Sequence, residues 1–189
     1  RDVAPSRGLG DVYKRQAYID QLMQSSDLLE FSKICDHKIL NNILCRYKKV
    51  CNDLHIAFHA DIRSNTTAFL SDSDVTSLLC NLLDNAVEAS QRIKDSYIEI
   101  SAAQREHTPF IIITMINSCA CNPFSPNGEL ISSKPDPQAH GFGIKSIEKI
   151  VHNYNGNMQM YYDGETFTFH TIIICLLYTS PSPRDGATS

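Results

Sequence analysis

The longest amphipathic helical pattern in this 189-residue chain runs over residues 75–94, and any fold must bury its apolar side. The apolar residues recur three or four positions apart, which places them in one broad stripe on a helix. Residues 71–74, Ser-Asp-Ser-Asp, offer several side chains suited to capping a helix N-terminus. The sequence therefore predicts a helix that lies against a core. The stripe consists of Val75, Leu78, Leu79, Leu82, Leu83, Ala86 and Val87.

Polar residues occupy the opposite side of this helix, at spacings that place them on one face. They are Asn81, Asp84, Asn85 and Glu88. A solvated helix face is the simplest interpretation. Asparagine is a poor helix former, however, and neither asparagine lies near a helix end, where capping would explain it. Their amide oxygens could instead serve a hard cation such as Mg²⁺, which keeps most of its waters and binds nucleotide phosphates. Both interpretations stay open at this point.

The other segments indicate further helices and strands around this helix. Periodic apolar residues predict helices over residues 37–53 and 141–154, and residues 17–25 have the pattern of a helix end. Asp163-Gly164 is a hairpin signal between the last two strands. Helices interleaved with a mixed, mainly antiparallel sheet are typical of a two-layer α/β sandwich with the helices on one face. The predicted strands are residues 55–62, 97–103, 110–116, 158–162 and 167–174.

A long segment without periodicity precedes the last helix. Residues 118–140 contain several prolines, and a loop of this length inside a domain is often an active-site lid. Gly141-Phe142-Gly143 follows it at the start of a helix. Glycines there let backbone N–H groups approach an anion, and the helix terminus adds partial positive charge. A GxG alone is a weak signal, since a loop-to-helix turn explains it equally well.

Composition argues against several function classes. The hydrophobic fraction of 42% and the charged fraction of 20% are those of an ordinary globular domain. The net charge is −4, and no stripe of Lys and Arg interleaved with aromatic residues is present, which argues against nucleic-acid binding. None of the seven cysteines forms a CxxC pair, which favours a reducing compartment. The sequence shows no apolar run long enough to predict a membrane span and no secretory signal.

Two motifs resemble those of the GHKL ATPases, the superfamily of gyrase, Hsp90, MutL and histidine kinases. Residues 81–89, NLLDNAVEA, are similar to the N box, and residues 140–147, HGFGIKSI, to the second glycine box, usually written HGxGLxxI. Both look most like the peptide-pheromone receptor histidine kinases of Gram-positive bacteria, a quorum-sensing subfamily. Asn117 stands where most members have the Asp of a DxGxG motif, and this subfamily commonly has Asn there. The resemblance covers residues 17–175 and implies the Bergerat ATP-binding fold.

The resemblance implies ATP and Mg²⁺ as ligands and gives each site residue a role. Asn85 would coordinate Mg²⁺ that bridges the ATP phosphates. Asn81 stands where hydrolysing members have the Glu that activates water. Its amide cannot act as a base, which favours transfer to a protein acceptor over hydrolysis. Asn117 would hydrogen-bond the adenine amino group. The other implied nucleotide contacts are Glu88, Lys134 in the lid, His140, Gly141 and Gly143.

The implied activity is that of an ATP:protein-histidine phosphotransferase, the catalytic domain of a two-component sensor histidine kinase. Family members carry the phosphoacceptor histidine on an upstream dimerisation helix. None of the seven histidines here has a helical His-Asp/Glu context, so we expect the acceptor domain to be missing and the fragment alone to be inactive.

The implied partners are the dimerisation domain, a second copy of the parent protein in a homodimer, and a response regulator. The domain would be cytoplasmic, with its parent in the bacterial cell membrane. Two alternatives remain: a non-catalytic nucleotide-binding regulatory module, and a serine-kinase anti-sigma factor of the same superfamily.

Both ends of the chain differ from the part between them. They are rich in Gly, Pro, Ser and Arg and lack an apolar period, which predicts flexible tails. They also resemble translated sequencing-adapter DNA, whose usual forms are GLGDVYKRQ and LLYTSPSPRD, so we expect them to be non-native or disordered. The predicted division of the chain is a tail at 1–16, the end of a dimerisation helix or linker at 17–30, an ATP-binding catalytic domain at 31–175, and a tail at 176–189.

Overall fold

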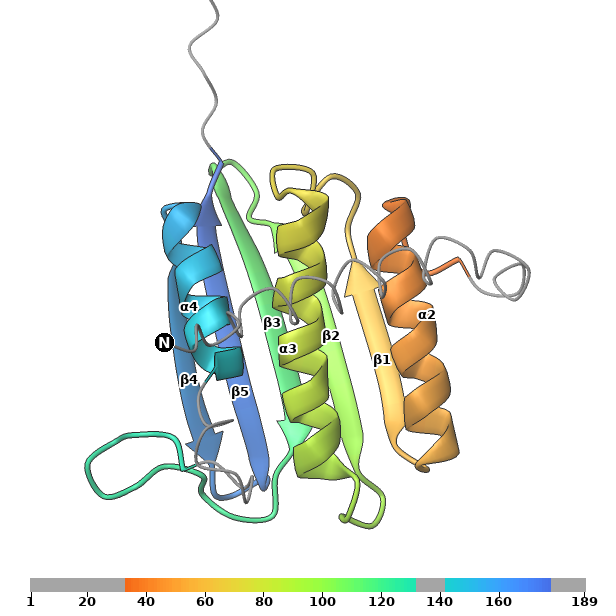
Figure 1. Ribbon diagram of the computed structural model, residues 1–189, viewed down its shortest axis with the longest axis vertical. Helices are drawn as coiled ribbons and strands as arrows, with labels where there is room; N and C mark the ends of the chain where they lie inside the picture. Colours follow the sequence, from red (N-terminus) through yellow and green to blue (C-terminus); the bar gives the residue numbers. More distant parts are fainter. Residues whose placement is uncertain (1–32, 132–141, 178–189) are drawn as a thin grey trace, which may run out of the picture.

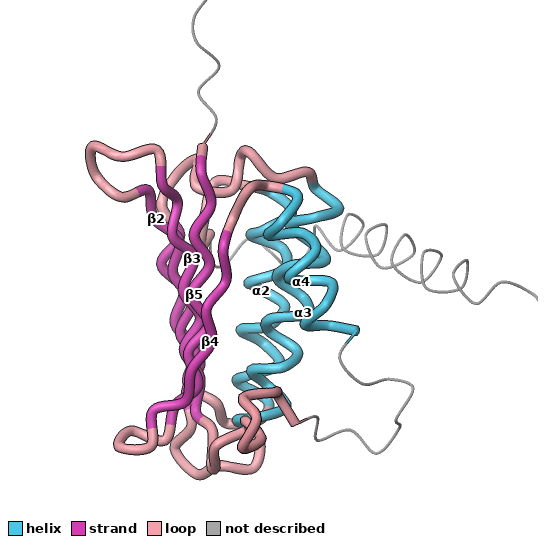
Figure 2. The backbone as a smooth tube through the Cα atoms, turned by 90° about the vertical axis from the view of Figure 1, so that its left-hand side faces the viewer, coloured by secondary structure: helices cyan, strands magenta, loops and turns pink. Residues whose placement is uncertain are grey.

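The computed structural model describes residues 33–131 and 142–177, which form two layers (Figures 1 and 2). A five-stranded sheet makes one layer, and the helices pack side by side on one of its faces. The predicted two-layer α/β sandwich is confirmed. In chain order the described elements are α2 (Lys38–Asp53), β1 (Ala57–Ile62), α3 (Asp72–Ser90), β2 (Tyr97–Gln104), β3 (Phe110–Ser118), α4 (Phe142–Asn153), β4 (Asn157–Asp163) and β5 (Thr168–Leu176).

The sheet is mixed and mainly antiparallel, in the order β1-β2-β3-β5-β4. β1 and β2 are parallel, whereas the other neighbouring strands are antiparallel. A parallel pair needs a crossover connection, and α3 supplies it here. The crossover places α3 in the middle of the helical layer, between α2 and α4 (Figure 1).

α3 forms where the sequence predicts it. The Ser71 side chain caps the helix by accepting a hydrogen bond from the Asp74 backbone N–H, at 3.2 Å. Acidic side chains in the first turn complement the partial positive charge of the helix N-terminus. The whole predicted stripe is buried except Val87, which packs half-buried against the core. The helix ends at Ser90 rather than residue 94, because the chain turns back toward β2.

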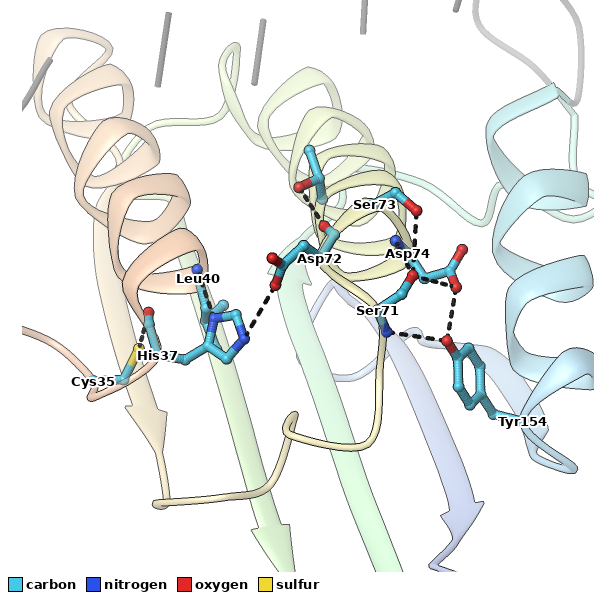
Figure 3. A network of polar contacts seen from close by, with 9 residues as sticks. Cys35, His37, Leu40, Ser71, Asp72, Ser73, Asp74 and Tyr154 are labelled. Atoms are coloured by element: carbon cyan, nitrogen blue, oxygen red, sulfur yellow. Dashed lines mark hydrogen bonds and ion pairs between the residues drawn. The ribbon is translucent and has the colours of Figure 1, made fainter. Parts of the chain in front are cut away.

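A polar network joins the end of α4 to the start of α3 (Figure 3). The Tyr154 hydroxyl donates a hydrogen bond to Oδ2 of Asp74, at 2.7 Å, and accepts one from the Ser71 backbone N–H, at 3.0 Å. Phe69 packs edge-on against the Tyr154 ring, with the ring centroids 5.6 Å apart. These contacts fix the position of α4 relative to α3.

The helices α2 and α4 are each followed by a left-handed residue, His55 and Asn155, that turns the chain into the next strand. After α2, His55 has a φ of 57°, the His55 N–H bonds to the Asn52 carbonyl, and the Ile56 N–H bonds to that of Cys51. This is the hydrogen-bond pattern of a Schellman cap. Because His55 belongs to the cap, β1 begins at Ala57 rather than at the predicted residue 55.

The last strand extends past the boundary that the sequence predicts for the domain. β5 continues to Leu176, and the Leu177 N–H donates to the Pro109 carbonyl at 2.7 Å. The predicted helix end at residues 17–25 lies outside the described residues. No helix in the described part of the chain has the length and apolar character needed to cross a membrane.

Candidate functional site

The polar face of α3 meets the first turn of α4 at Gly143. A Cβ atom added to Gly143 would lie 3.4 Å from Oδ1 of Asn81 and 3.9 Å from Nδ2 of Asn85. Both asparagines are half-buried. The fold therefore brings together three of the predicted site residues, although Gly143 is distant from the asparagines in sequence. The missing side chain at Gly143 keeps the space next to the two amides open.

The orientation of the Asn81 amide follows from a hydrogen bond inside α3. Its Nδ2 donates to the Ser77 carbonyl at 2.7 Å, which leaves Oδ1 as the atom that faces Gly143. One turn earlier, the hydroxyls of Ser77 and Ser146 lie 3.3 Å apart and link α3 to α4. Within the described residues, nothing hydrogen-bonds the Asn85 side chain. Two amides thus line the junction between α3 and α4.

Asp84, which belongs to the same polar face, has a structural partner instead. The Tyr47 hydroxyl of α2 donates to Oδ1 of Asp84 at 2.6 Å. Burial, followed by the hydrogen bond to Asp84, raises the pKa of Tyr47 above its ordinary value, so the phenol stays protonated. Asp84 therefore ties α3 to α2, and only part of the polar face points toward α4. Glu88, one turn beyond Asp84, is half-buried.

Asn117 lies at the end of β3, on the face of the sheet that the helices cover. It continues the alternation of Ile111, Ile113 and Met115, which all point into the core, and it is only 4% exposed. Its Nδ2 donates to the Ser118 carbonyl at 2.9 Å. Asn117 is therefore a buried polar residue in an apolar row, which calls for a functional or structural reason.

A hydrogen bond places the Asn117 end of β3 beside the last turn of α3. The Ser90 hydroxyl donates to the Ser118 carbonyl at 3.1 Å. Asn81 and Ser90 are nine residues apart, which corresponds to about 13.5 Å along the helix axis. The candidate site thus extends along α3, from the Gly143 junction in the middle of the helix to Asn117 at its end.

The segment after β3 has more structure than its sequence suggests. Within residues 119–131, Phe124 and Leu130 form a β-bridge around a turn. The Phe124 ring packs against Phe169, with centroids 5.8 Å apart, and Phe169 is the register partner of Asn117 on β5. Periodicity could not reveal this contact, because it joins two isolated aromatic residues. Lys134, His140 and Gly141, the other predicted contacts, lie outside the described residues.

Comparison with known proteins gives the family. The profile of the GHKL domain matches residues 70–174, more than half of the chain. The chain belongs to the GHKL family. Domains of this family bind ATP, and the match includes the α3 asparagines, Asn117 and Gly143. No curated protein matches the sequence.

Solved histidine kinases share the fold of this GHKL domain. The catalytic domain of histidine kinase ThkA matches with a TM-score of 0.56 at 16% identity, over 74% of this chain and 92% of that one. The mycobacterial sensor histidine kinase MprB matches with a TM-score of 0.55 at 14% identity, over 74% and 93%. The histidine kinase domain from Erythrobacter litoralis EL346 matches with a TM-score of 0.56 at 11% identity, over 87% and 74%. The five-stranded sheet with its helical layer is therefore the ATP-binding fold of histidine kinase catalytic domains.

Proposed function

We propose that this GHKL domain is the catalytic domain of a two-component sensor histidine kinase. It would bind Mg²⁺–ATP and transfer the γ-phosphoryl group to a histidine of a dimerisation domain outside this chain. The observation that carries the proposal is the approach of Gly143 to the amides of Asn81 and Asn85. A glycine at the start of a helix, next to two polar side chains with available atoms, suits the binding of phosphate groups.

The residues at this junction fit a nucleotide with its metal. Asn85 would ligate Mg²⁺ through its amide oxygen, since Mg²⁺ takes oxygen ligands from a few side chains and from substrate phosphates. Bound Mg²⁺ would offset the negative charge that the phosphates carry. The N-terminus of α4 would add partial positive charge beside Gly143. Gly141, His140 and Lys134 are proposed as further phosphate contacts, and Glu88 as a nucleotide contact.

Asn81 is proposed to serve the metal side of the nucleotide, where its amide oxygen could accept a hydrogen bond from a water of hydrated Mg²⁺, without activating water for attack. Its donor end is bonded to the Ser77 carbonyl, so only the carbonyl oxygen of the amide faces the junction. A carboxamide oxygen is far less basic than a carboxylate, so it cannot take a proton from water at neutral pH. A site without a general base at this position favours transfer to a well-placed protein nucleophile, where positioning and charge neutralisation provide most of the catalysis.

Asn117 is proposed to bind the base of the nucleotide. Oδ1 of Asn117 receives no hydrogen bond from any described residue, and the adenine amino group is a donor that could use it. The base would then lie near the end of α3 and the phosphates near Gly143. The distance of about 13.5 Å between Asn81 and Ser90 along the helix is one that an extended nucleoside triphosphate can span.

The parent protein is proposed to be a homodimer in the bacterial cell membrane, with this domain in the cytoplasm and a response regulator downstream. The peptide-pheromone receptor subfamily is the proposed branch, because the residues of the two boxes resemble it. The dimerisation domain would bring the acceptor histidine to the phosphate end of the site.

Nucleotide binding is the first test. In calorimetry with the folded chain, we expect a non-hydrolysable ATP analogue to bind in the presence of Mg²⁺ and to bind markedly more weakly when EDTA removes the metal. A folded sample that gives no binding heat at millimolar nucleotide would contradict the proposal.

Phosphoryl transfer is the second test, and it separates a kinase from a regulatory nucleotide-binding module. With γ-³²P-ATP, the chain alone should not acquire acid-labile, base-stable label. A separately supplied dimerisation domain with its histidine should become labelled when the chain is added, and its His→Ala variant should not. ATP binding without transfer to that domain would favour the regulatory module, and labelling of a serine on a partner would favour the anti-sigma class.

A further inference from the structure

Ser118, at the end of β3, is held by hydrogen bonds from three elements of the fold. The Ser118 carbonyl accepts hydrogen bonds from Nδ2 of Asn117, at 2.9 Å, and from the Ser90 hydroxyl of α3, at 3.1 Å. The Ser118 hydroxyl accepts one from the Tyr97 backbone N–H at the start of β2, at 3.0 Å. Ser90 is fully buried, and Asn117 and Ser118 are 4% and 7% exposed. Water therefore has little access to replace these bonds.

This carbonyl determines which way the Asn117 amide points. A carboxamide has a donor end and an acceptor end of nearly the same shape, and a backbone carbonyl can only accept. Nδ2 must therefore be the atom that faces Ser118, and Oδ1 faces the opposite way. A rotation of the amide by 180° would place Oδ1 against the Ser118 carbonyl, so that two acceptors would meet in a buried setting where an unmade hydrogen bond is unfavourable.

The fixed orientation has a consequence for the nucleotide base. At position 6, adenine carries an amino group, which donates, whereas hypoxanthine and guanine carry an oxygen, which accepts. An asparagine that is free to rotate can bind either kind of base by turning Oδ1 or Nδ2 toward it. An asparagine fixed with Oδ1 outward can bind only the amino form.

We propose that Ser90 is a positioning residue that acts through the Ser118 carbonyl to hold the Asn117 amide, so that the site selects 6-amino purines over 6-oxo purines. The proposal rests on the proposed function, which places the base at Asn117. Ser90 itself does not contact the nucleotide. The Ser90 hydroxyl fixes the direction of the carbonyl from the α3 side, and the Tyr97 N–H bonds to the Ser118 hydroxyl from the β2 side. Without Ser90 the carbonyl can turn away from Asn117, and the amide then loses the acceptor that fixes its orientation.

An aspartate at position 117 would not need this anchor. Both oxygens of a carboxylate accept hydrogen bonds, so rotation leaves an acceptor facing the base in either orientation. The other oxygen then meets the Ser118 carbonyl, which weakens the binding of both nucleotides but keeps the preference for a 6-amino group. Dependence on Ser90 is therefore a property of asparagine at this position, and it should disappear when Asn117 is replaced by aspartate.

The experiment measures the affinities of the full chain for ATP and for inosine triphosphate, which differ at position 6 of the base, both with Mg²⁺. The readout is the ratio of the two dissociation constants, which cancels effects on the shared ribose and phosphates. Ser90→Ala should lower this selectivity for ATP about 3- to 10-fold, through weaker ATP binding and stronger binding of the inosine nucleotide. Ser90→Ala combined with Asn117→Asp should restore selectivity for ATP.

Thr76→Val is the matched control, because Thr76 is another buried hydroxyl of α3 that donates to a backbone carbonyl, that of Asp72, at 2.7 Å. It should leave the ratio unchanged, and melting curves should show all variants folded. Equal weakening of both nucleotides by Ser90→Ala would mean a structural role and would overturn the proposal. An unchanged ratio in Ser90→Ala, or a double variant that fails to regain selectivity, would also overturn it. If the unmodified chain binds no ATP, the proposed function itself is wrong, and that result is distinct from these.

Discussion

Asn85→Ala is expected to abolish most metal-dependent ATP binding while the domain keeps its fold. An interaction with a charged partner contributes roughly 1.5–3 kcal/mol, which corresponds to a loss of affinity of about 10- to 150-fold. Nothing else in the described structure depends on this side chain through a hydrogen bond, and α3 gains helix propensity because alanine is the better helix former by roughly 0.5 kcal/mol. The melting temperature should therefore stay near or above that of the unmodified chain.

Two measurements on the same sample separate a metal role from a packing role. Calorimetry with Mg²⁺ and an ATP analogue gives the affinity, and thermal unfolding gives the stability. Asn52→Ala is a suitable control, because it removes an exposed amide from α2, and α2 and α4 lie on opposite sides of α3 (Figure 1). It should leave the affinity unchanged and keep the melting temperature near or above that of the unmodified chain, by the same gain in helix propensity. Loss of binding together with loss of folding would indicate a structural asparagine, and an Asn85→Ala chain that binds Mg²⁺–ATP normally would refute the metal assignment.

Local patterns predicted most elements of the fold because each element buries one periodic face. The α3 stripe and the alternation along β2 give both the element and its inward side, whereas the run Ile172-Ile173-Ile174 indicates β5 but not which of its faces is buried. Boundaries were less predictable where a cap overrides the pattern. His55 continues the alternation of β1 but takes the left-handed conformation of a helix cap, which no apolar period can reveal.

The candidate site could be predicted only in part, since its geometry depends on contacts between distant residues. The two boxes indicated Asn81 and Gly143, and the structure places these two residues side by side, whereas their role in nucleotide binding stays a prediction. Their pattern did not distinguish Asp84, which bonds to Tyr47, from its neighbours on the same face. It also did not predict which end of each amide is free. The free end is set by the Ser77 carbonyl for Asn81 and by the Ser118 carbonyl for Asn117.

Gly156→Ala is expected to destabilise the domain strongly, although the backbone of Gly156 is not left-handed. After α4, Asn155 takes that role, with a φ of 50°, and its N–H bonds to the His152 carbonyl. The Gly156 N–H completes the Schellman cap by donating to the Val151 carbonyl at 2.9 Å. The two residues thus have different functions. Asn155 takes the left-handed conformation of the turn, and Gly156 permits a close approach to the sheet.

The close approach leaves no room for a methyl group. A Cβ on Gly156 would lie 2.9 Å from Sγ of Cys175, from the Ile174 carbonyl oxygen and from Cγ1 of Val151. One of these atoms is backbone of the neighbouring strand β5, so relief requires movement of the α4–β4 connection against the sheet. Overpacking of this kind costs about 1–3 kcal/mol, which lowers the melting temperature of a domain of this size by several degrees.

Gly164→Ala provides the matched comparison, because a Cβ there meets only Cε1 of Tyr162, at 3.7 Å, an ordinary contact. Thermal or urea unfolding of the two variants should show a large loss for Gly156→Ala and a small change for Gly164→Ala. Since α4 carries Gly143 into contact with the α3 asparagines, displacement of its C-terminal end should also weaken nucleotide binding in Gly156→Ala. Equal stability of the two variants would show that the chain after α4 can move away from Cys175 at little cost, and the packing account of Gly156 would then be wrong.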